Sequence, residues 1–389
     1  MAPLRIAIVA GEASGDELGA SLLRALASRD VPVEARGVGG PVLKAAGLES
    51  LFDQSDIAVM GFGPVIRRLP LLMRRIRETA DGLVAWQPDL VLTIDAPDFC
   101  KRVARRIRAA APGIPTVHWV CPSVWAWRPG RAPAMKPYID DILCLLPFEP
   151  DALARLGGPR GHFVGHPLIE TLAEYRPRDA AESARRHDAG RALALLLPGS
   201  RHAELHHLLP VFLETVRESL RQRPGLHWVL PTLKRLEPDV RSRVEAANLP
   251  IEVVADEGAK RAAFRQARLA LAASGTVTLE LALAGIPTVA AYRVAPWEAF
   301  IARRLIKVPS VILPNLILEE RAVPEFLQEA AIMDRLAPAV LDLLDDSPAR
   351  QAQIEAFTRL EARMRGDASS PSEKAARLVL DVIAKRRET

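Results

Sequence analysis

The chain has 389 residues, more than the about 250–300 residues at which a single hydrophobic core stops growing, so we expect two domains. Hydrophobic residues make up 49% of it and charged residues 25%, a balance that excludes an intrinsically disordered protein. The formal net charge of +5 suits an anionic small substrate or an acidic membrane surface. It is too weak to predict nucleic-acid binding.

The cysteines and the N-terminal segment indicate the compartment. Cys100, Cys121 and Cys144 contain no C-x-x-C pair and are odd in number, so we expect buried or half-buried thiols in a reducing compartment. The apolar run Ile6–Ala10 is too short for the core of a signal peptide. The nearly uncharged stretch Leu269–Tyr292 contains glycine, glutamate and proline, which favours strand, loop, helix and strand over a membrane span. We therefore expect a cytoplasmic protein.

Short apolar runs alternate with amphipathic stretches, the pattern of a parallel α/β sheet. In the first half the expected strands are Arg5–Ala10, Val33–Gly37, Asp89–Ile94, Thr116–Val120 and Ile142–Leu145. The expected helices lie near Glu17–Ser28, Pro70–Trp86 and Phe99–Ala110. The polar stretch Ala173–Arg191 is interpreted as a linker or a surface helix.

The alternation restarts after that stretch. The expected strands are Ala192–Leu197, His227–Leu230, Ile251–Val254, Leu269–Ala272 and Thr288–Tyr292. A last helix begins after Ser370, where Pro371 suits the first position and Glu373 completes a capping box. The fold class is therefore α/β, with two doubly wound domains over 1–170 and 190–365. The C-terminal helix, 366–389, can pack back on the first domain.

Ligands of doubly wound folds bind outside the carboxyl ends of the strands, so the loops there are the candidate sites. The first strand is followed by Gly11-Glu12-Ala13-Ser14-Gly15-Asp16, where small residues let an anion approach a helix N-terminus. The alternative is a tight turn capped by Ser14 or Asp16.

The third expected strand is followed by Asp95-Ala96-Pro97-Asp98. One of the two carboxylates can serve as a general base. The alternative is that Asp98 only caps the helix that begins at Phe99.

Two loops of the second half resemble anion-binding turns. Gly199 and Ser200 can offer backbone N–H groups, and Arg201 can bind a phosphate with its fork of donors. The loop Ser274-Gly275-Thr276 also lies between a strand and a helix. Glu280, one turn into that helix, can accept from ribose hydroxyls, and the alternative is a surface carboxylate.

A metal site is not expected. His202, His206 and His207 include one pair four residues apart, His202 and His206, with Glu204 between them. The order is H-x-E-x-H rather than H-E-x-x-H, and no further set of ligands lies nearby.

The segment Ile57–Arg77 mixes apolar side chains with five arginines, which favours an interfacial segment on anionic lipid. The alternative is a core helix with a charged back. The residues predicted to enter the lipid are Phe62, Ile66, Leu69, Leu72 and Met73. Trp125 and Trp127 lie in a loop with flanking prolines and are expected to form a wall or lid of the ligand site.

Taken in order and spacing, AGEASGD, IDAPDF, PSVWAWR, LPFE, VGHP, PGSR, ASGTVTLE and LPN closely resemble the lipid-A-disaccharide synthases. The resemblance runs from Ile6 to about Gln328, and no core motif is missing. It implies the GT-B glycosyltransferase fold, two Rossmann-like domains with the active site in the cleft between them. It also implies a metal-independent enzyme that needs no cofactor.

The family's reaction joins UDP-2,3-diacylglucosamine to 2,3-diacylglucosamine 1-phosphate through a β(1→6) bond, with inversion and release of UDP. It takes place at the inner face of the cytoplasmic membrane. Carried over by position, Asp98 is the catalytic base and Arg201 meets the charge of UDP. Glu280 and Asn315 are expected near the nucleotide. Ser14, Gly15, Asp16, Asp95, Trp125 and Trp127 are expected on the acceptor side.

Two other functions are compatible with the sequence. A UDP-sugar epimerase of the same fold would not need the arginine-rich segment or an acceptor. An inactive nucleotide-sugar-binding protein at the membrane would not need Asp98 beside a complete Pro198–Arg201 loop.

Overall fold

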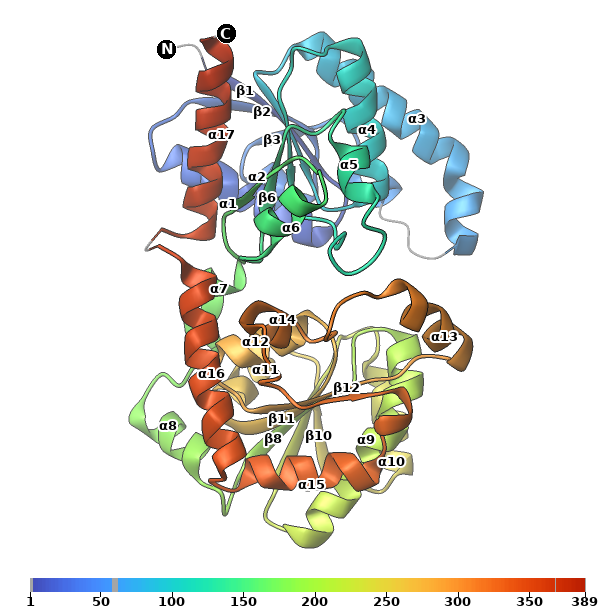
Figure 1. The fold of residues 1–389 in the computed structure, drawn as a ribbon, viewed down its shortest axis with the longest axis vertical. Coiled ribbons are helices and arrows are strands. Elements are labelled where there is room, and N and C mark those ends of the chain that lie inside the picture. The colour runs from blue at the N-terminus through green and yellow to red at the C-terminus, as the bar shows by residue number, and fades with distance from the viewer. Residues whose placement is uncertain (1–2, 58–61, 368, 389) are drawn as a thin grey trace. The chain divides into compact units, whose positions relative to one another are not determined.

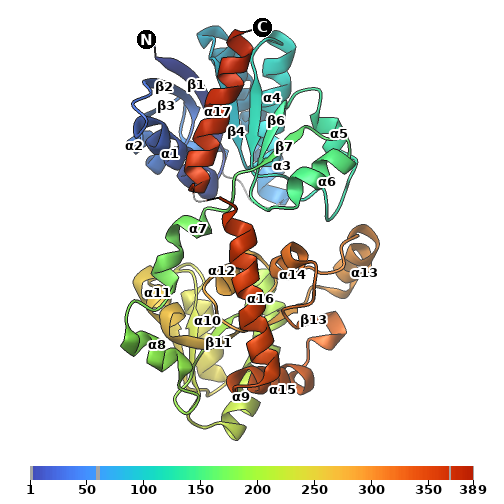
Figure 2. The same ribbon diagram turned by 60° about the vertical axis from the view of Figure 1, so that its left-hand side comes forward.

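The structure is a computed structural model that describes residues 3–57, 62–367 and 369–388, and of 62–67 it describes the backbone alone. The chain divides into two units, each with its own sheet (Figures 1 and 2). Unit 1 is Met1–Pro167 with Asp367–Thr389, and unit 2 is Leu168–Gly366.

Unit 1 is built on a parallel sheet in the order β3-β2-β1-β4-β5-β6-β7. Its strands are β1 (Leu4–Ala10), β2 (Val33–Val38), β3 (Leu48–Ser50), β4 (Leu90–Ile94), β5 (Thr116–Trp119), β6 (Asp141–Cys144) and β7 (Arg160–Phe163). Its helices are α1 (Ala13–Ala27), α2 (Pro41–Ala45), α3 (Phe62–Trp86), α4 (Pro97–Ala110), α5 (Arg131–Met135), α6 (Glu149–Arg155) and α17 (Pro371–Arg387), with a 3₁₀ turn η1 (Gln54–Asp56).

Helices cover both faces of this sheet, so its strands are apolar on both sides. Ile6 and Ile8 of β1 join one core with α1 and α17, whereas Ala7 and Val9 join a second core with α3 and α4. This alternation is the two-residue period of a strand. The C-terminal helix α17 lies beside α1, as both views show (Figures 1 and 2).

Unit 2 has a parallel sheet in the order β10-β9-β8-β11-β12-β13. Its strands are β8 (Leu193–Leu197), β9 (His227–Pro231), β10 (Ile251–Val254), β11 (Ala267–Ala273), β12 (Thr288–Tyr292) and β13 (Glu325–Leu327). Its helices are α7 (Leu168–Thr171), α8 (Ala180–His187), α9 (His202–Gln222), α10 (Glu237–Ala246), α11 (Glu257–Gln266), α12 (Thr276–Leu283), α13 (Pro296–Leu305), α14 (Leu313–Leu318), α15 (Met333–Leu344) and α16 (Pro348–Arg365), with 3₁₀ turns η2 (Leu172–Tyr175) and η3 (Gln328–Ala330).

The two faces of β11 separate in the same way. Leu269 and Leu271 join a core with α9 and α15, and Ala270 and Ala272 join the opposite core with Phe264 of α11. Both sheets reverse their strand order once, between β1 and β4 in unit 1 and between β8 and β11 in unit 2. Ligands of doubly wound sheets bind at these reversals.

The predicted α/β class with two doubly wound sheets is confirmed. The capping box is also present, since Ser370 Oγ accepts from Glu373 N at 3.2 Å and Glu373 Oε2 from Ser370 N at 2.9 Å. The expected start of a helix at Pro70 is wrong, because α3 begins at Phe62 and contains Pro70 in its interior. The short strands β3, β7 and β13 were not predicted.

Candidate functional site

The loop after β1 places its polar side chains in different directions. The helix α1 begins at Ala13, and its N-cap residue Glu12 makes no side-chain capping bond. The interpretation that Ser14 or Asp16 caps this helix is therefore wrong.

The side chain of Asp16 is instead buried at 2% exposure and binds the start of α2. Its Oδ1 accepts from Gly40 N at 2.6 Å and from Leu43 N at 3.2 Å, and its Oδ2 from Val42 N at 3.0 Å. Asp16 was predicted as an acceptor-side residue, and these bonds show that it stabilises the N-terminus of α2. Three backbone donors would otherwise have no partner there.

Ser14 and Asp95 meet at the reversal of the sheet. Ser14 Oγ donates to Asp95 Oδ2 at 3.0 Å, which joins the ends of β1 and β4. Asp95 and Ala96 both have left-handed backbone, with φ of 51° and 40°. A Cβ on Gly11 would lie 2.5 Å from the Cβ of Ala96, so only glycine fits where these two loops approach each other.

Glu12 belongs to the same group of side chains, although sequence reasoning did not select it. Partial burial and the negative charge of Asp95 raise the pKa of Glu12. A carboxyl group whose ionisation is opposed by burial and by a neighbouring negative charge, at the end of a sheet, is typical of functional sites. The sequence signal that could have selected Glu12 was its position next to Gly11, directly after the first strand.

Asp98 is an exposed residue in the first turn of α4. The helix begins at Pro97 and its N-cap residue is Ala96, so the alternative that Asp98 only caps the helix is wrong. Its carboxylate stands where the helix dipole favours negative charge.

A cavity of about 230 Å³ lies beside these loops in unit 1. Its wall includes Asp95, His118, Cys121, Ser123, Trp127 and Arg131. Arg128 and Arg131 lie over the Trp127 ring at 4.4 and 5.0 Å. Burial and the charge of Lys101 lower the pKa of His118 to about 4, so this imidazole is neutral at pH 7. The cavity therefore combines an aromatic wall with cationic and carboxylate groups.

Trp125 is directed elsewhere. Its Nε1 donates to Glu149 Oε1 at 3.2 Å, and its ring meets Phe148 edge-on with 5.0 Å between centroids. The two tryptophans predicted as one wall thus divide between the cavity and α6. A larger hollow of about 550 Å³ in unit 2 is lined by none of the predicted site residues.

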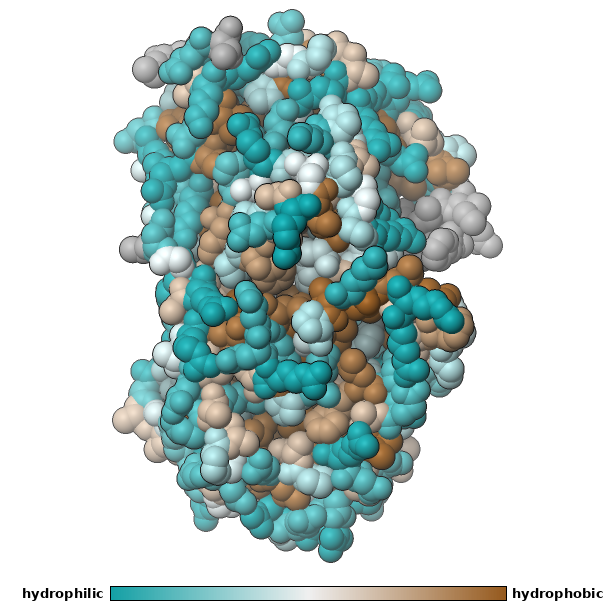
Figure 3. Space-filling view, in the orientation of Figure 1, coloured by the Kyte–Doolittle hydropathy of each residue, from teal (hydrophilic) through white to brown (hydrophobic). Residues whose placement is uncertain are grey.

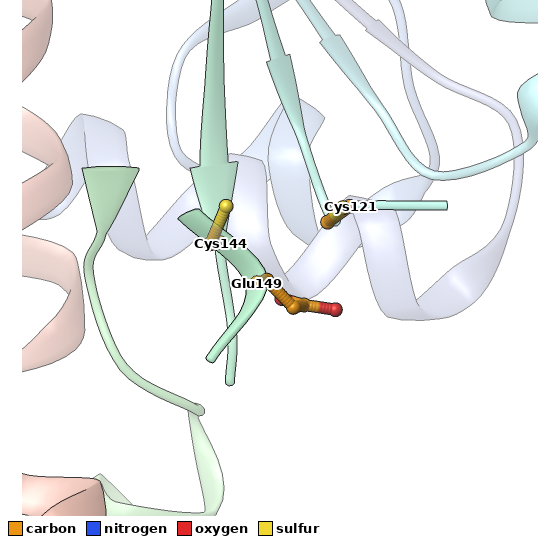
Figure 4. Close-up of side chains that lie close together, drawn as sticks. All are labelled: Cys121, Cys144 and Glu149. Carbon is orange, nitrogen blue, oxygen red and sulfur yellow. The ribbon is translucent and has the colours of Figure 1, made fainter. Parts of the chain in front are cut away.

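Cys121, Cys144 and Glu149 form the one group that could hold a metal ion among the residues that the structure describes (Figure 4). Their ligand atoms lie within 4.8 Å of one another, at the ends of β5 and β6 and the start of α6. The three cysteines are buried free thiols, as expected.

The bonds of Glu149 account for this group without a metal. Its Oε2 accepts from Leu145 N and Leu146 N, both at 3.0 Å, and its Oε1 accepts from Trp125. Burial raises the pKa of Glu149 to about 7. The hydrogen bond to Cys144 and burial raise the pKa of the Cys121 thiol. A cation here would have to displace the backbone donors and ionise a thiol.

In unit 2 the loop Pro198–Arg201 is held by Glu204 of α9. Gly199 has φ +116°, and a Cβ there would lie 2.4 Å from Glu204 Oε2, so glycine is required. Glu204 Oε2 accepts from Ser200 N at 2.8 Å, and Glu204 Oε1 accepts from Arg201 Nη1 at 3.1 Å. The Arg201 side chain is nevertheless 75% exposed, and its other donors can reach a ligand.

The loop Ser274–Thr276 follows the adjacent strand, β11. Ser274 Oγ donates to the carbonyl oxygen of Val311 at 2.8 Å. A Cβ on Gly275 would meet nothing within 4 Å, so the space in front of the N-terminus of α12 is open. An anion can approach the free N–H groups of this helix there.

Glu280 and Asn315 both have protein partners. Glu280 Oε1 accepts from Lys260 Nζ at 3.0 Å, and its side chain is only 13% exposed, so the surface alternative is wrong. Asn315 is 3% exposed. It exchanges two hydrogen bonds with the backbone of Val323, at 3.0 and 2.8 Å, which holds the loop that follows α14.

Part of the predicted interfacial segment lies outside the described residues, namely 58–61 and the side chains of 62–67, which include those of Phe62 and Ile66. Leu69 and Met73 of α3 are each 47% exposed, and Leu72 is half-buried. Arg68, Arg74 and Arg77 are exposed beside them. No helix within the described ranges is long and apolar enough to cross a membrane.

Comparisons with known proteins show the family to which the chain belongs. Residues 6–379 match the family model described as Lipid-A-disaccharide synthetase. The chain is 50% identical over 380 residues to a lipid-A-disaccharide synthase of Nitrobacter hamburgensis, covering 97% of this chain and 96% of that one. It is 47% identical over 384 residues to that of Bradyrhizobium diazoefficiens, covering 98% and 97%.

Two solved structures share the fold at low identity. The calicheamicin glycosyltransferase matches with a TM-score of 0.60 and 19% identity, covering 99% of each chain. The UDP-GlcNAc 2-epimerase of Neisseria meningitidis matches with a TM-score of 0.58 and 11% identity, covering 98% of this chain and 100% of that one. The predicted GT-B-like fold is thereby confirmed, whereas the epimerase likeness extends to the fold alone. With a family match over nearly its whole length, this chain belongs to the lipid-A-disaccharide synthases, the glycosyltransferases of lipid A biosynthesis.

Proposed function

We propose that the chain transfers 2,3-diacylglucosamine from UDP to the 6-hydroxyl of 2,3-diacylglucosamine 1-phosphate, with inversion at the anomeric carbon. The family supports the reaction class. The exposed Asp98, free of any capping role, is the observation that carries the residue assignment. In this proposal 1–170 binds the acceptor, 190–365 binds the UDP-sugar, and 366–389 completes the first domain.

Asp98 acts as the general base. As the 6-oxygen of the acceptor forms its bond to the anomeric carbon, its proton passes to the Asp98 carboxylate. The bond from that carbon to the UDP oxygen breaks, and UDP leaves with the electron pair. Inversion follows from a single displacement.

Ser14 supports this chemistry by holding Asp95 at the end of β4. With Asp95 engaged, the accessible carboxylate on this loop is that of Asp98. Burial and the charge of Asp95 raise the pKa of Glu12, which belongs to the same group of side chains, and its carboxyl group can hydrogen-bond to a sugar hydroxyl. Trp127 offers an apolar face to the acceptor, and Arg131 offers a cation to its 1-phosphate.

The groups of unit 2 meet the charge on the leaving UDP. Arg201 binds the diphosphate with its exposed donors, and the N–H groups at Gly275 and Thr276 lie at the positive end of α12. Glu280, one turn further along the same helix and paired with Lys260, is the proposed acceptor for the ribose hydroxyls. Asn315 acts by shaping the loop after α14. These groups supply the positive charge that a metal ion would otherwise supply, so we propose that transfer is metal-independent.

The substrates carry acyl chains, and we propose that α3 docks on the inner face of the cytoplasmic membrane. Leu69 and Met73 would enter the lipid while Arg68, Arg74 and Arg77 meet its anionic head groups. The protein would then be peripheral.

The test is UDP release by the purified chain with both diacylated substrates in detergent and with EDTA present, with the product resolved by mass spectrometry. Acceptor-dependent release of UDP with a tetraacyl disaccharide 1-phosphate supports the proposal. Turnover of UDP-N-acetylglucosamine without acceptor would indicate an epimerase instead, and binding without turnover an inactive protein.

Two variants with matched controls test the residues. Asp98→Asn should lower kcat about 10²–10⁴-fold, whereas Asp151→Asn, an exposed aspartate after a proline in the first turn of α6, should not. Arg201→Ala should raise the KM for the UDP-sugar. Arg221→Ala is its control, because Arg221 is 70% exposed and pairs with Glu218 three residues away on the same helix. An Asp98→Asn variant with near-normal kcat would remove the base assignment.

A further inference from the structure

Unit 2 carries a second amphipathic helix that the proposed function does not use, α13. Four large apolar side chains on it are exposed to solvent. They are Trp297 at 65%, Phe300 at 61%, Ile301 at 46% and Leu305 at 42%. Ile306, directly after the helix, is 38% exposed. Scattered exposed apolar residues are common on proteins, but five within ten positions are not.

These side chains share one face of the helix. Phe300, Ile301 and Leu305 follow Trp297 at three, four and eight positions, the spacing that aligns residues on a helix surface. Ala299 lies on the opposite side and is buried at 6% exposure, so it marks the covered face of the helix. The apolar face of α13 is therefore the exposed one. In Figure 3 brown residues gather over α13 next to teal ones.

Cations flank this face. Arg304 lies on it, with its guanidinium 3.5 Å from the centroid of the Phe300 ring. Arg303 is next to it and pairs with the exposed Glu329 at 2.6 Å. Lys307 is exposed after the helix, and Arg293 precedes it. The one acidic residue within α13, Glu298, accepts from the backbone N–H of Ala295 at 3.2 Å.

This combination fits the interface of an anionic bilayer better than it fits a protein partner. Tryptophan is enriched at the level of the lipid head groups, and phenylalanine and isoleucine enter the acyl region below it. An arginine stacked on a ring can bury its stem and keep its charge at the surface. A protein partner for this face would have to supply acidic residues to match Arg304 and Lys307, because Arg303 is already paired with Glu329.

We propose that α13 inserts its Trp297, Phe300, Ile301 and Leu305 face into an anionic lipid surface, as a membrane contact of unit 2 separate from α3. The contact depends on neither substrate nor turnover. The proposal therefore goes beyond the proposed function, and the enzyme could transfer the sugar even if α13 did not bind lipid.

Vesicle binding measures the affinity of the protein for anionic lipid. The whole chain is sedimented with vesicles of phosphatidylcholine alone or with phosphatidylglycerol added, at low and at high salt. Removing three large apolar contacts in Trp297→Ser/Phe300→Ser/Ile301→Ser should lower the partition coefficient to anionic vesicles at least about tenfold. Leu233→Ser is the matched control, because Leu233 is 46% exposed, as Ile301 is, and should leave it unchanged. Added phosphatidylglycerol should strengthen binding, and high salt should weaken it.

Fluorescence identifies the helix itself, even where α3 also holds the protein on the vesicle. Trp297 is the most exposed tryptophan of the described residues, so lipids brominated on their acyl chains should quench its emission. The quenched fraction should disappear in Trp297→Phe. Equal quenching of the wild type and this variant would overturn the proposal, as would a triple variant that binds normally. Concentration-dependent dimerisation lost in the triple variant, without any change on vesicles, would assign the face to a second copy and overturn it too.

Discussion

Replacing Glu149 with glutamine should make the stability of unit 1 less dependent on pH. The carboxyl is 3% exposed, and burial raises its pKa from 4.5 to about 7. Because its pKa in the folded state is the higher one, the folded protein binds the proton more tightly than the unfolded chain does. The contribution of Glu149 to the free energy of unfolding is therefore fully present below pH 4.5 and is lost as the pH rises to 7.

The size of this effect follows from the shift. Each pKa unit corresponds to about 1.4 kcal/mol, so a pKa of about 7 gives a loss on the order of 3 kcal/mol across this range. Glutamine has nearly the shape of a protonated glutamate and does not titrate. Its Nε2 cannot accept from an N–H donor, so the variant should be less stable than the wild type at pH 4.5. Between pH 4.5 and pH 8 the difference in stability should move by that amount in favour of the variant.

Hydrogen exchange of the β5 and β6 amides, followed by mass spectrometry from pH 4.5 to 8, measures this difference within unit 1. The buried histidines titrate in both proteins, so their contribution cancels in the comparison. Asp151→Asn on the same helix is the control. A difference between wild type and Glu149→Gln that stays constant with pH would refute the reasoning. It would mean that the three N–H donors stabilise the anion as much as burial destabilises it.

Other substitutions test two loops of unit 1 and its helix α3. Asp16→Asn should destabilise unit 1 by about 1–3 kcal/mol in thermal unfolding, because an amide cannot accept from all three backbone donors, whereas exposed Glu17→Gln should not. Ala96→Gly should stabilise the protein by about 1 kcal/mol, because a φ of 40° is unfavourable for alanine. The same change should lower kcat, because the loop that carries Asp98 becomes more flexible. A fall in melting temperature would contradict the first expectation. Leu69→Ser/Met73→Ser should weaken vesicle binding severalfold, and unchanged binding by a folded variant would remove α3 from the membrane proposal.

Length and periodicity decided which elements could be predicted. The central strands are apolar runs bounded by turns, so β1, β4 and β8 were placed within a residue or two. The strands β3 and β13 have three residues each and lie at sheet edges, too short to show a pattern. The predicted helix began at Pro70, yet α3 begins at Phe62 and contains this proline in its interior.

The positions of the candidate loops were predictable because parallel strands end at one edge of their sheet. The direction of each side chain was not. Asp16 turns to a backbone segment that starts 24 residues later, and this depends on how α2 packs rather than on any local pattern. Glu12 gained its raised pKa from Asp95, a residue of another loop. The proximity of Cys121 and Cys144 follows from the pairing of β5 with β6.

The return of α17 to unit 1 has a consequence for the order of folding. Ala375, Ala376, Val379 and Ile383 complete the core beside α1, but the ribosome makes them only after the whole of unit 2. Unit 2 is continuous and can fold during synthesis. Unit 1 is incomplete until α17 is made, and until then the apolar groove that α17 fills is exposed. Nascent chains would therefore present this groove to chaperones until the last helix is released.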